Sequence, residues 1–155
     1  MSIAIGLSVF DSSLYIPELR AKKRDSVLSE LVSRAHRAGA VREPAVLLET
    51  LCLRERLGST AAGKGVAVPN ARSLTVRDPR LVLARSRRGI DWGAPDDLAV
   101  HLVLLVLSPA EASEDAHHEF LARALGATRL QRHRQKLIEA ATFDAVASAL
   151  RELTA

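Results

Sequence analysis

The sequence predicts an α/β fold in which a mixed central β-sheet is flanked by helices on both sides. Three observations predict it: helical periodicity near both ends of the chain, short apolar runs in the middle, and one run, 102–107, that is apolar at every position. A strand of that kind is typical of a sheet covered on both faces. The length of 155 residues suits one compact domain, and we expect it to span residues 1–155.

The first half of the chain predicts two helices. Apolar residues recur at spacings of three and four over residues 24–37, and Gly39 ends this helix. Pro44 is placed well as the first residue of a second helix, which stops near Gly58. Cys52, the only cysteine, falls on the apolar side of that helix, so we interpret it as a small core residue rather than a reactive thiol.

The middle of the chain predicts strands. Short runs rich in Val, Leu and Ala predict strands at residues 66–68, 81–85 and 99–107. A glycine-rich loop, 58–65, leads into the first of them, and residues 89–95 are interpreted as turns around a short edge piece.

The end of the chain returns to helical periodicity. We expect helices at about residues 113–125, 129–141 and 143–153. Thr142 precedes the last of these, where its hydroxyl can cap the free amides of the first turn. The charged face of 129–136 is interpreted as a solvated helix surface.

Composition narrows the function classes. The net charge is +4, with 22 basic and 18 acidic residues, and aromatic residues are 3% of the chain. The net charge is the only feature that suggests nucleic-acid binding, and the chain has few aromatic residues on which bases could stack. We therefore predict no nucleic-acid partner. No basic-then-apolar leader and no apolar run near 20 residues is present, which favours a cytoplasmic protein without membrane insertion.

The loop 58–65, Gly-Ser-Thr-Ala-Ala-Gly-Lys-Gly, nearly matches a nucleotide-binding P-loop. Gly65 stands where that motif needs a Ser or Thr for Mg²⁺, and the loop follows a helix instead of a strand, so nucleotide binding is not expected. Gly63 and Gly65 can simply turn the backbone. Alternatively, the loop amides with the Ser59 and Thr60 hydroxyls form an anion site.

A longer motif includes this loop. Residues 53–72 read Leu-Arg-Glu-Arg-Leu-Gly-Ser-Thr-Ala-Ala-Gly-Lys-Gly-Val-Ala-Val-Pro-Asn-Ala-Arg. This run resembles the active-site signature of the type-2 enzyme IIA domain of the bacterial phosphoenolpyruvate-dependent phosphotransferase system, R-E, G-S-T, G-x-G-[IV]-A-[IV]-P-H. The type includes fructose, mannitol and nitrogen-regulatory members. The resemblance extends from about residue 20 to the end and implies the mannitol/fructose enzyme IIA fold.

One position departs from that signature. The resemblance implies a phosphoacceptor histidine, charged by the carrier HPr, at the position of Asn70. The lone pair of a carboxamide nitrogen is delocalised into its carbonyl, so Asn70 cannot replace the nucleophile. By the same resemblance Arg54 stabilises phosphoryl oxygens and His117 assists the acceptor. The alternative for Arg54 is a helix-end arginine that neutralises the terminal carbonyls and the helix dipole. His117 and His118 are adjacent on a helix, about 100° apart, so we predict no metal site.

These observations favour a nitrogen-regulatory type of enzyme IIA-like protein that is a regulatory or docking module and not an enzyme. The predicted pocket is built from Arg54, Ser59, Thr60, Gly63, Gly65, Asn70, Arg72 and His117. The resemblance implies protein partners, namely an HPr-like phosphocarrier, a regulatory kinase or a transporter, and no cofactor. The alternative is an active phosphocarrier that receives its phosphoryl group from HPr at His117.

Overall fold

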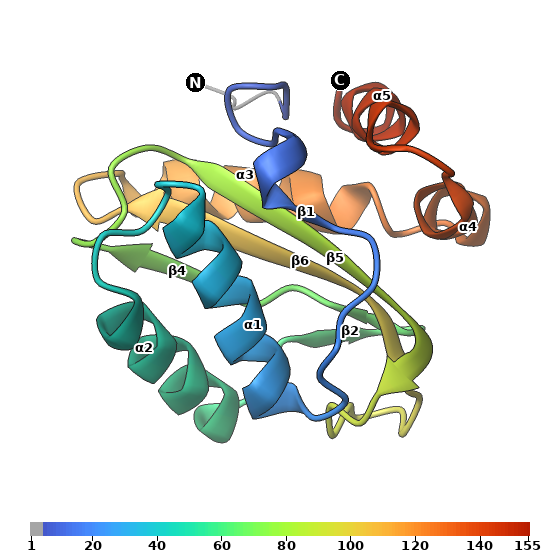
Figure 1. The fold of residues 1–155 in the computed structure, drawn as a ribbon, viewed down its shortest axis with the longest axis horizontal. Coiled ribbons are helices and arrows are strands. Elements are labelled where there is room, and N and C mark those ends of the chain that lie inside the picture. The colour runs from blue at the N-terminus through green and yellow to red at the C-terminus, as the bar shows by residue number, and fades with distance from the viewer. Residues whose placement is uncertain (1–4) are drawn as a thin grey trace.

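A mixed β-sheet forms the centre of the molecule (Figure 1). The computed structural model describes residues 5–155, and within them six strands have the order β1-β5-β6-β3-β2, with β4 also paired to β6. The strands are β1 (Tyr15–Ile16), β2 (Ala61–Gly63), β3 (Val66–Ala67), β4 (Asn70–Ser73), β5 (Arg80–Ile90) and β6 (Val100–Pro109).

Strand β6 is the centre of the sheet. It pairs antiparallel with β5, with Leu83 opposite Leu104, and parallel with β3 and β4 on its other side. The side chains from Leu102 to Leu107 are all 0% exposed. The two-sided apolar run therefore forms the central, covered strand that the sequence predicts.

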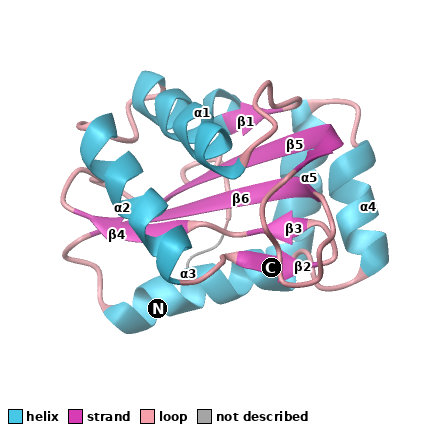
Figure 2. Cartoon of the chain, turned by 90° about the horizontal axis from the view of Figure 1, so that it is seen from below, coloured by secondary structure: helices cyan, strands magenta, loops and turns pink. Residues whose placement is uncertain are grey.

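Helices cover both faces of this sheet. On one face lie α1 (Arg24–Arg37) and α2 (Pro44–Leu57), and on the other lies α3 (Glu114–Gly126), as Figure 2 shows. The C-terminal helices α4 (Gln131–Glu139) and α5 (Phe143–Thr154) follow, and α5 contacts both α3 and α4. A short 3₁₀ helix, η1 (Ser12–Leu14), precedes β1. The predicted fold class is confirmed.

The local signals for helix ends are confirmed. The Thr142 hydroxyl accepts a hydrogen bond from the amide of Ala145 at 3.1 Å, and Ser113 caps α3 in the same way through the amide of Ala116 at 3.0 Å. Pro44 is the first residue of α2, where its missing N–H costs no helical hydrogen bond. Within residues 5–155, none of the helices is both long enough and apolar enough to cross a bilayer.

Several boundaries differ from the prediction. Strand β5 continues beyond the predicted end at Arg85 to Ile90. The sequence did not indicate this extension because residues 85–89 include no apolar side chain, and Arg87 and Arg88 are exposed. Strands β2 and β4 lie in segments that were not expected to be strands. β2 is built from alanine and glycine, and its pairing with β3 depends on the turn between them rather than on side-chain periodicity.

Candidate functional site

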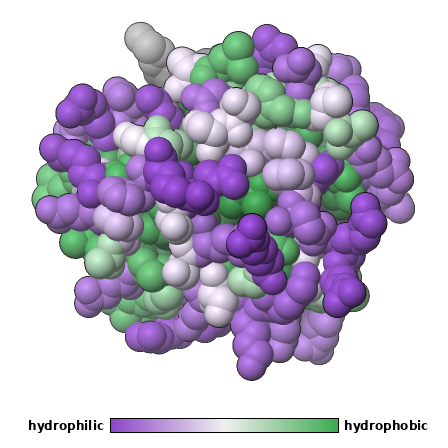
Figure 3. Space-filling model, viewed as in Figure 1, coloured by the Kyte–Doolittle hydropathy of each residue, from purple (hydrophilic) through white to green (hydrophobic). Residues whose placement is uncertain are grey.

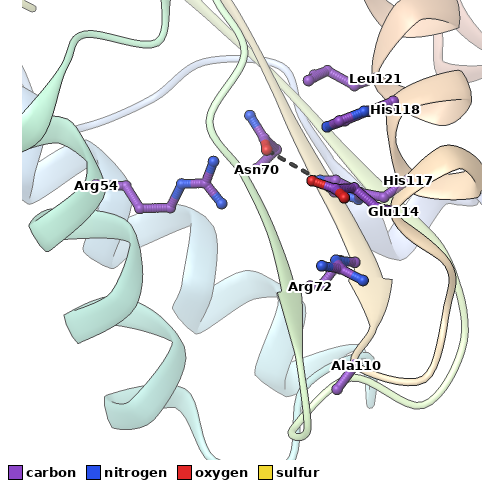
Figure 4. A pocket seen from close by; sticks show the side chains of 8 residues that line it. All are labelled: Arg54, Asn70, Arg72, Ala110, Glu114, His117, His118 and Leu121. Carbon is purple, nitrogen blue, oxygen red and sulfur yellow. Dashed lines mark hydrogen bonds between the residues drawn. The ribbon is translucent and has the colours of Figure 1, made fainter.

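A pocket of about 440 Å³ opens between α2, β4 and α3. Arg54 comes from the last turn of α2, and Asn70 and Arg72 come from β4. The remaining walls belong to α3 and the segment before it. The lining residues are Arg54, Asn70, Arg72, Ala110, Glu114, His117, His118 and Leu121 (Figure 4).

The sheet register brings these elements together. β4 runs parallel to the second half of β6, with Asn70 beside Val106 and Ser73 beside Pro109. The chain then leaves β6 and enters α3, whose cap at Ser113 sets the direction of the helix. His117, the fourth residue of α3, consequently faces back onto β4 and is only 5% exposed. Asn70 and His117, which are 47 residues apart in the sequence, thus come into contact.

A chain of hydrogen bonds joins Ser108, His117 and Asn70. The Ser108 hydroxyl oxygen lies 2.7 Å from Nδ1 of His117, and Nε2 of the same ring lies 3.1 Å from Oδ1 of Asn70. The carboxamide nitrogen of Asn70 donates to the carbonyl of Val68 at 3.0 Å. Ser108, Asn70 and His117 are 1%, 8% and 5% exposed, so these three hydrogen-bonded side chains have little contact with water.

These hydrogen bonds determine which nitrogen of the His117 ring carries the proton. Because Nδ2 of Asn70 is directed at the Val68 carbonyl, Oδ1 is the atom that faces His117, and an amide oxygen can only accept. Nε2 of His117 therefore carries the proton. In the neutral ring Nδ1 then accepts from the Ser108 hydroxyl. Both ring nitrogens are occupied within the protein.

The surroundings of His117 favour its neutral form. Burial lowers the pKa of this histidine below its ordinary value, because the charged imidazolium loses hydration. The positive charges of Arg54, Arg72 and His118 lower that pKa further. Arg54, Arg72 and His118 therefore bring positive charge close to His117.

The two arginines of the pocket differ in how they are held. Arg54 points from α2 toward Asn70 (Figure 4). Within residues 5–155 its guanidinium makes no hydrogen bond to protein atoms and no ion pair. Arg72 donates to the carbonyl of Ala112 at 2.9 Å and so holds the segment that leads into α3. Glu114 supplies the single carboxylate among the lining residues.

The predicted pocket was too large. Ser59 and Thr60 do not line it. Glu55, 5% exposed, accepts from the Thr60 amide at 3.1 Å and from the Thr60 hydroxyl. The Ser59 hydroxyl accepts from the amide of Ala61 at 3.1 Å. These polar groups stabilise the end of α2 instead of facing a ligand.

Gly63 and Gly65 are also absent from the pocket lining and serve the turn between β2 and β3. Gly65 has φ +82°, a conformation that favours glycine, and a Cβ there would lie 3.3 Å from the Ala99 carbonyl oxygen. Between them, the Lys64 amide donates to the Asp96 carboxylate at 2.8 Å. This bond and one from the Leu98 amide lower the pKa of Asp96. Three amides of the loop considered as an anion site, those of Thr60, Ala61 and Lys64, thus bind side chains of the same protein.

Four polar residues that line the pocket or hold the segments around it were not predicted as part of it: Glu55, Ser108, Glu114 and His118. Glu55 belongs to the R-E part of the signature, so that motif could have signalled a buried carboxylate. Ser108 is a polar residue directly after an apolar run, which is a usable signal for a polar contact at a strand end. Glu114 had no distinguishing signal. No group of three or more His, Cys, Asp or Glu residues able to hold a metal occurs in the described part of the chain.

The sheet order, the covering helices and the pocket at the end of β6 define a phosphotransferase-system IIA domain. The fold matches the nitrogen regulatory protein IIA-Ntr of Neisseria meningitidis with a TM-score of 0.85 and 26% identity, covering 92% of this chain and 97% of that one. Residues 8–153 match the family "Phosphoenolpyruvate-dependent sugar phosphotransferase system, EIIA 2", and the chain belongs to this family.

Relatives come from several branches of the family. The nitrogen regulatory protein of Bradyrhizobium diazoefficiens is 35% identical over 135 residues, which is 87% of each chain. The fructose-specific EIIABC component of Bacillus subtilis is 29% identical over 128 residues, and this chain spans 20% of its length. A structure of the Escherichia coli enzyme IIA for mannitol in complex with phosphorylated enzyme IIB shares the fold, with a TM-score of 0.77, 18% identity and coverage of 92% and 97%.

Proposed function

We propose that this chain is a single enzyme IIA-type domain of the nitrogen-regulatory kind that does not accept a phosphoryl group and acts by docking to partner proteins. One observation carries the proposal. Asn70 stands directly after Pro69 in the signature, and its carboxamide is hydrogen-bonded at both ends inside the pocket.

The chemistry of Asn70 supports this proposal. Phosphoryl transfer to a side chain needs an atom with an available lone pair in line with the leaving group. The nitrogen of Asn70 lacks one, because amide resonance delocalises it, and its N–H donates to Val68. The oxygen of Asn70 accepts the Nε2 proton of His117.

His117 is the alternative acceptor, and its contacts do not favour it. Nε2 carries a proton and Nδ1 accepts from Ser108, so an attack on phosphorus would require a change of tautomer or the loss of a buried hydrogen bond. His117 is also only 5% exposed. We therefore assign His117 a positioning role toward Asn70.

The similarity to known relatives supports protein partners for this chain. The similarity to nitrogen regulatory proteins over most of both chains supports a regulatory role in preference to sugar transport. The complex of the mannitol enzyme IIA with phosphorylated enzyme IIB shows that this fold can present a surface to a phosphorylated protein. An HPr-like phosphocarrier, a regulatory kinase or a transporter are the partner classes that we propose.

A labelling experiment tests the proposal. The chain is incubated with labelled phosphoenolpyruvate, enzyme I and HPr, and we expect it to remain unlabelled. The Asn70→His variant restores an imidazole and is expected to take up an acid-labile phosphoryl group, which also shows that the carrier recognises the chain. Stoichiometric label on the natural chain would overturn the proposal, and loss of that label in His117→Ala would identify His117 as the acceptor.

A further inference from the structure

A second basic surface lies on the other side of β6 from the pocket. It is an open groove of about 510 Å³ where the segment that follows β1 meets the second half of β5. The two segments run side by side (Figure 1), and the Leu19 amide donates to the Arg85 carbonyl at 2.8 Å. Hydrophilic residues lie over this part of the surface (Figure 3). The basic residues that line the groove are Arg20, Lys22, Arg85, Arg87 and Arg88, and its one carboxylate is that of Glu18.

The groove concentrates the positive charge of the chain. Its five basic side chains and single carboxylate leave a surplus of four positive charges, which equals the net charge of the entire sequence. The charged residues outside the groove therefore balance one another in number. Positive charge that is collected on one surface attracts anionic partners and steers their approach, whereas scattered charge does not.

Two carboxylates beside the groove are already used by backbone amides. Both oxygens of Glu18 accept from the Arg87 amide at 3.1 Å. Glu30 accepts from the Arg20 amide at 3.1 Å and from the Ala21 amide at 2.9 Å. These carboxylates fix the backbone of the two segments, and neither forms an ion pair with a basic side chain of the described chain.

Four basic side chains of the groove, called the groove cations below, have no partner in the described chain. They are Arg20, Lys22, Arg87 and Arg88. All four residues are exposed, and within residues 5–155 their side-chain nitrogens form neither an ion pair nor a hydrogen bond to the protein. Arg85 differs, because its guanidinium donates to three carbonyls at the C-terminal end of α4. The free charges thus stand on a backbone that is fixed on both sides.

The lining favours carboxylates of a protein over phosphate groups. Phosphate sites commonly combine cations with free backbone amides, but the amides of Arg20 and Arg87 are occupied by carboxylates of this chain. Single-stranded nucleic acid needs aromatic side chains on which its bases stack, and no aromatic residue of the described chain lines the groove. An open groove with separate cations suits carboxylates that are distributed along a polypeptide.

We propose that this groove binds an acidic segment, rich in Asp and Glu, of a partner protein. The inference rests on the docking role in the proposed function and gives that role a surface, but it does not depend on the chemistry at Asn70. No residue lines both the groove and the pocket. β5 pairs with one side of β6 and β4 with the other, so a partner in the groove leaves the Asn70 pocket open. The chain can therefore hold an acidic partner and a phosphocarrier at the same time.

Binding of a defined acidic peptide tests the inference. The probe is a fluorescently labelled peptide of alternating Glu and Gly residues, which is titrated with the full chain and followed by fluorescence anisotropy. The same peptide with Gln in place of Glu is the uncharged control. We expect saturable binding of the Glu peptide alone, which weakens as the salt is raised from about 20 mM to about 150 mM. Equal binding of the two peptides, or no binding at the lower salt concentration, would overturn the inference.

Matched double variants locate the binding. Arg87→Ala combined with Arg88→Ala removes two groove cations and should weaken peptide binding at least about fivefold. Arg129→Ala combined with Arg132→Ala lowers the net charge equally at exposed positions outside the groove, and should change the affinity less than about twofold. Arg54→Ala, in the pocket, should leave the affinity unchanged. Equal weakening in the two double variants would overturn the inference.

A second groove variant guards against a folding defect. Circular dichroism checks that each variant is folded, and Arg20→Ala combined with Lys22→Ala removes the cations of the other segment. This variant should weaken peptide binding to a similar degree. Unchanged binding in both groove variants would overturn the inference.

The remaining outcomes distinguish other occupants and the proposed function. Duplex DNA or tripolyphosphate that binds more tightly than the peptide would overturn the inference in favour of a phosphate ligand. Self-association of the chain that is lost in the groove variants would overturn it in favour of a second copy. Phosphoryl label on the chain would overturn the non-accepting part of the proposed function and leave the peptide result unaffected.

Discussion

Replacing Glu55 by alanine should destabilise the whole domain, although this residue lies outside the pocket. Its carboxylate is 5% exposed and accepts hydrogen bonds from the Thr60 amide at 3.1 Å, from the Thr60 hydroxyl and from the indole nitrogen of Trp92 at 3.3 Å. These contacts join the end of α2 to the loop before β2 and to the segment between β5 and β6. Glu55→Ala removes all of them.

The size of the effect follows from these contacts. Hydrogen bonds to a charged acceptor contribute about 1.5–3 kcal/mol, and an unpaired buried donor costs about 1–3 kcal/mol. Trp92 is 2% exposed, so its indole N–H would be left unpaired. Release of a buried carboxylate that has no ion-pair partner in the described chain offsets part of this cost. We expect a net loss of about 2–4 kcal/mol in the free energy of unfolding, or about 5–15 °C in Tm.

Urea unfolding followed by tryptophan fluorescence measures this loss, since Trp92 is the only tryptophan and is buried. Glu49→Ala, an exposed glutamate on the same helix, is the control and should change stability by less than about 0.5 kcal/mol. A loss for Glu55→Ala no larger than that of the control, at an unchanged m-value, would refute the assignment of Glu55 as the residue that holds this loop.

Two further predictions concern pH and the hairpin turn. Because the pKa of His117 is lowered in the folded state, the unfolded chain binds more protons below about pH 6.5, so stability should fall as the pH drops below that value and level off below the folded pKa. The His117→Gln variant should lack this part of the pH dependence. The prediction would be contradicted if the unfolding free energy changed between about pH 7 and pH 5 by the same amount in the variant and in the unmodified chain. Gly65→Ala should cost about 1–2 kcal/mol, because φ is +82° and the new Cβ would lie 3.3 Å from the Ala99 oxygen. Both glycine variants are compared by thermal unfolding. The backbone at Gly58 is extended and the space around it is open, so Gly58→Ala should leave the stability unchanged, and equal losses in the two variants would contradict the account.

Much of the fold follows from local signals in the sequence. The helix at 24–37, the start of α2 at Pro44 and the cap at Thr142 were predicted at their observed positions, because periodicity and capping act within a few residues. The central strand was predicted from its two-sided apolar run. Strand β4 was not, because Asn-Ala-Arg-Ser has no strand pattern and pairs with β6 through long-range register.

The candidate site was predicted less completely. Of the predicted pocket residues, Arg54, Asn70, Arg72 and His117 line one pocket. The loop residues Ser59, Thr60, Gly63 and Gly65 do not, since loop amides look the same in sequence whether a ligand or a carboxylate of the chain binds them. The carboxylates that bind this loop, Glu55 at the Thr60 amide and Asp96 at the Lys64 amide, become visible only when the tertiary contacts are known.

The central claim is that the chain docks to a phosphorylated partner without accepting the phosphoryl group. The most direct measurement is to mix the chain with HPr that carries a labelled phosphoryl group, isolate the complex and determine which protein bears the label. We predict a complex of both proteins with all of the label on HPr. Label on the chain, or a carrier that has lost its phosphoryl group in the complex, would contradict the claim.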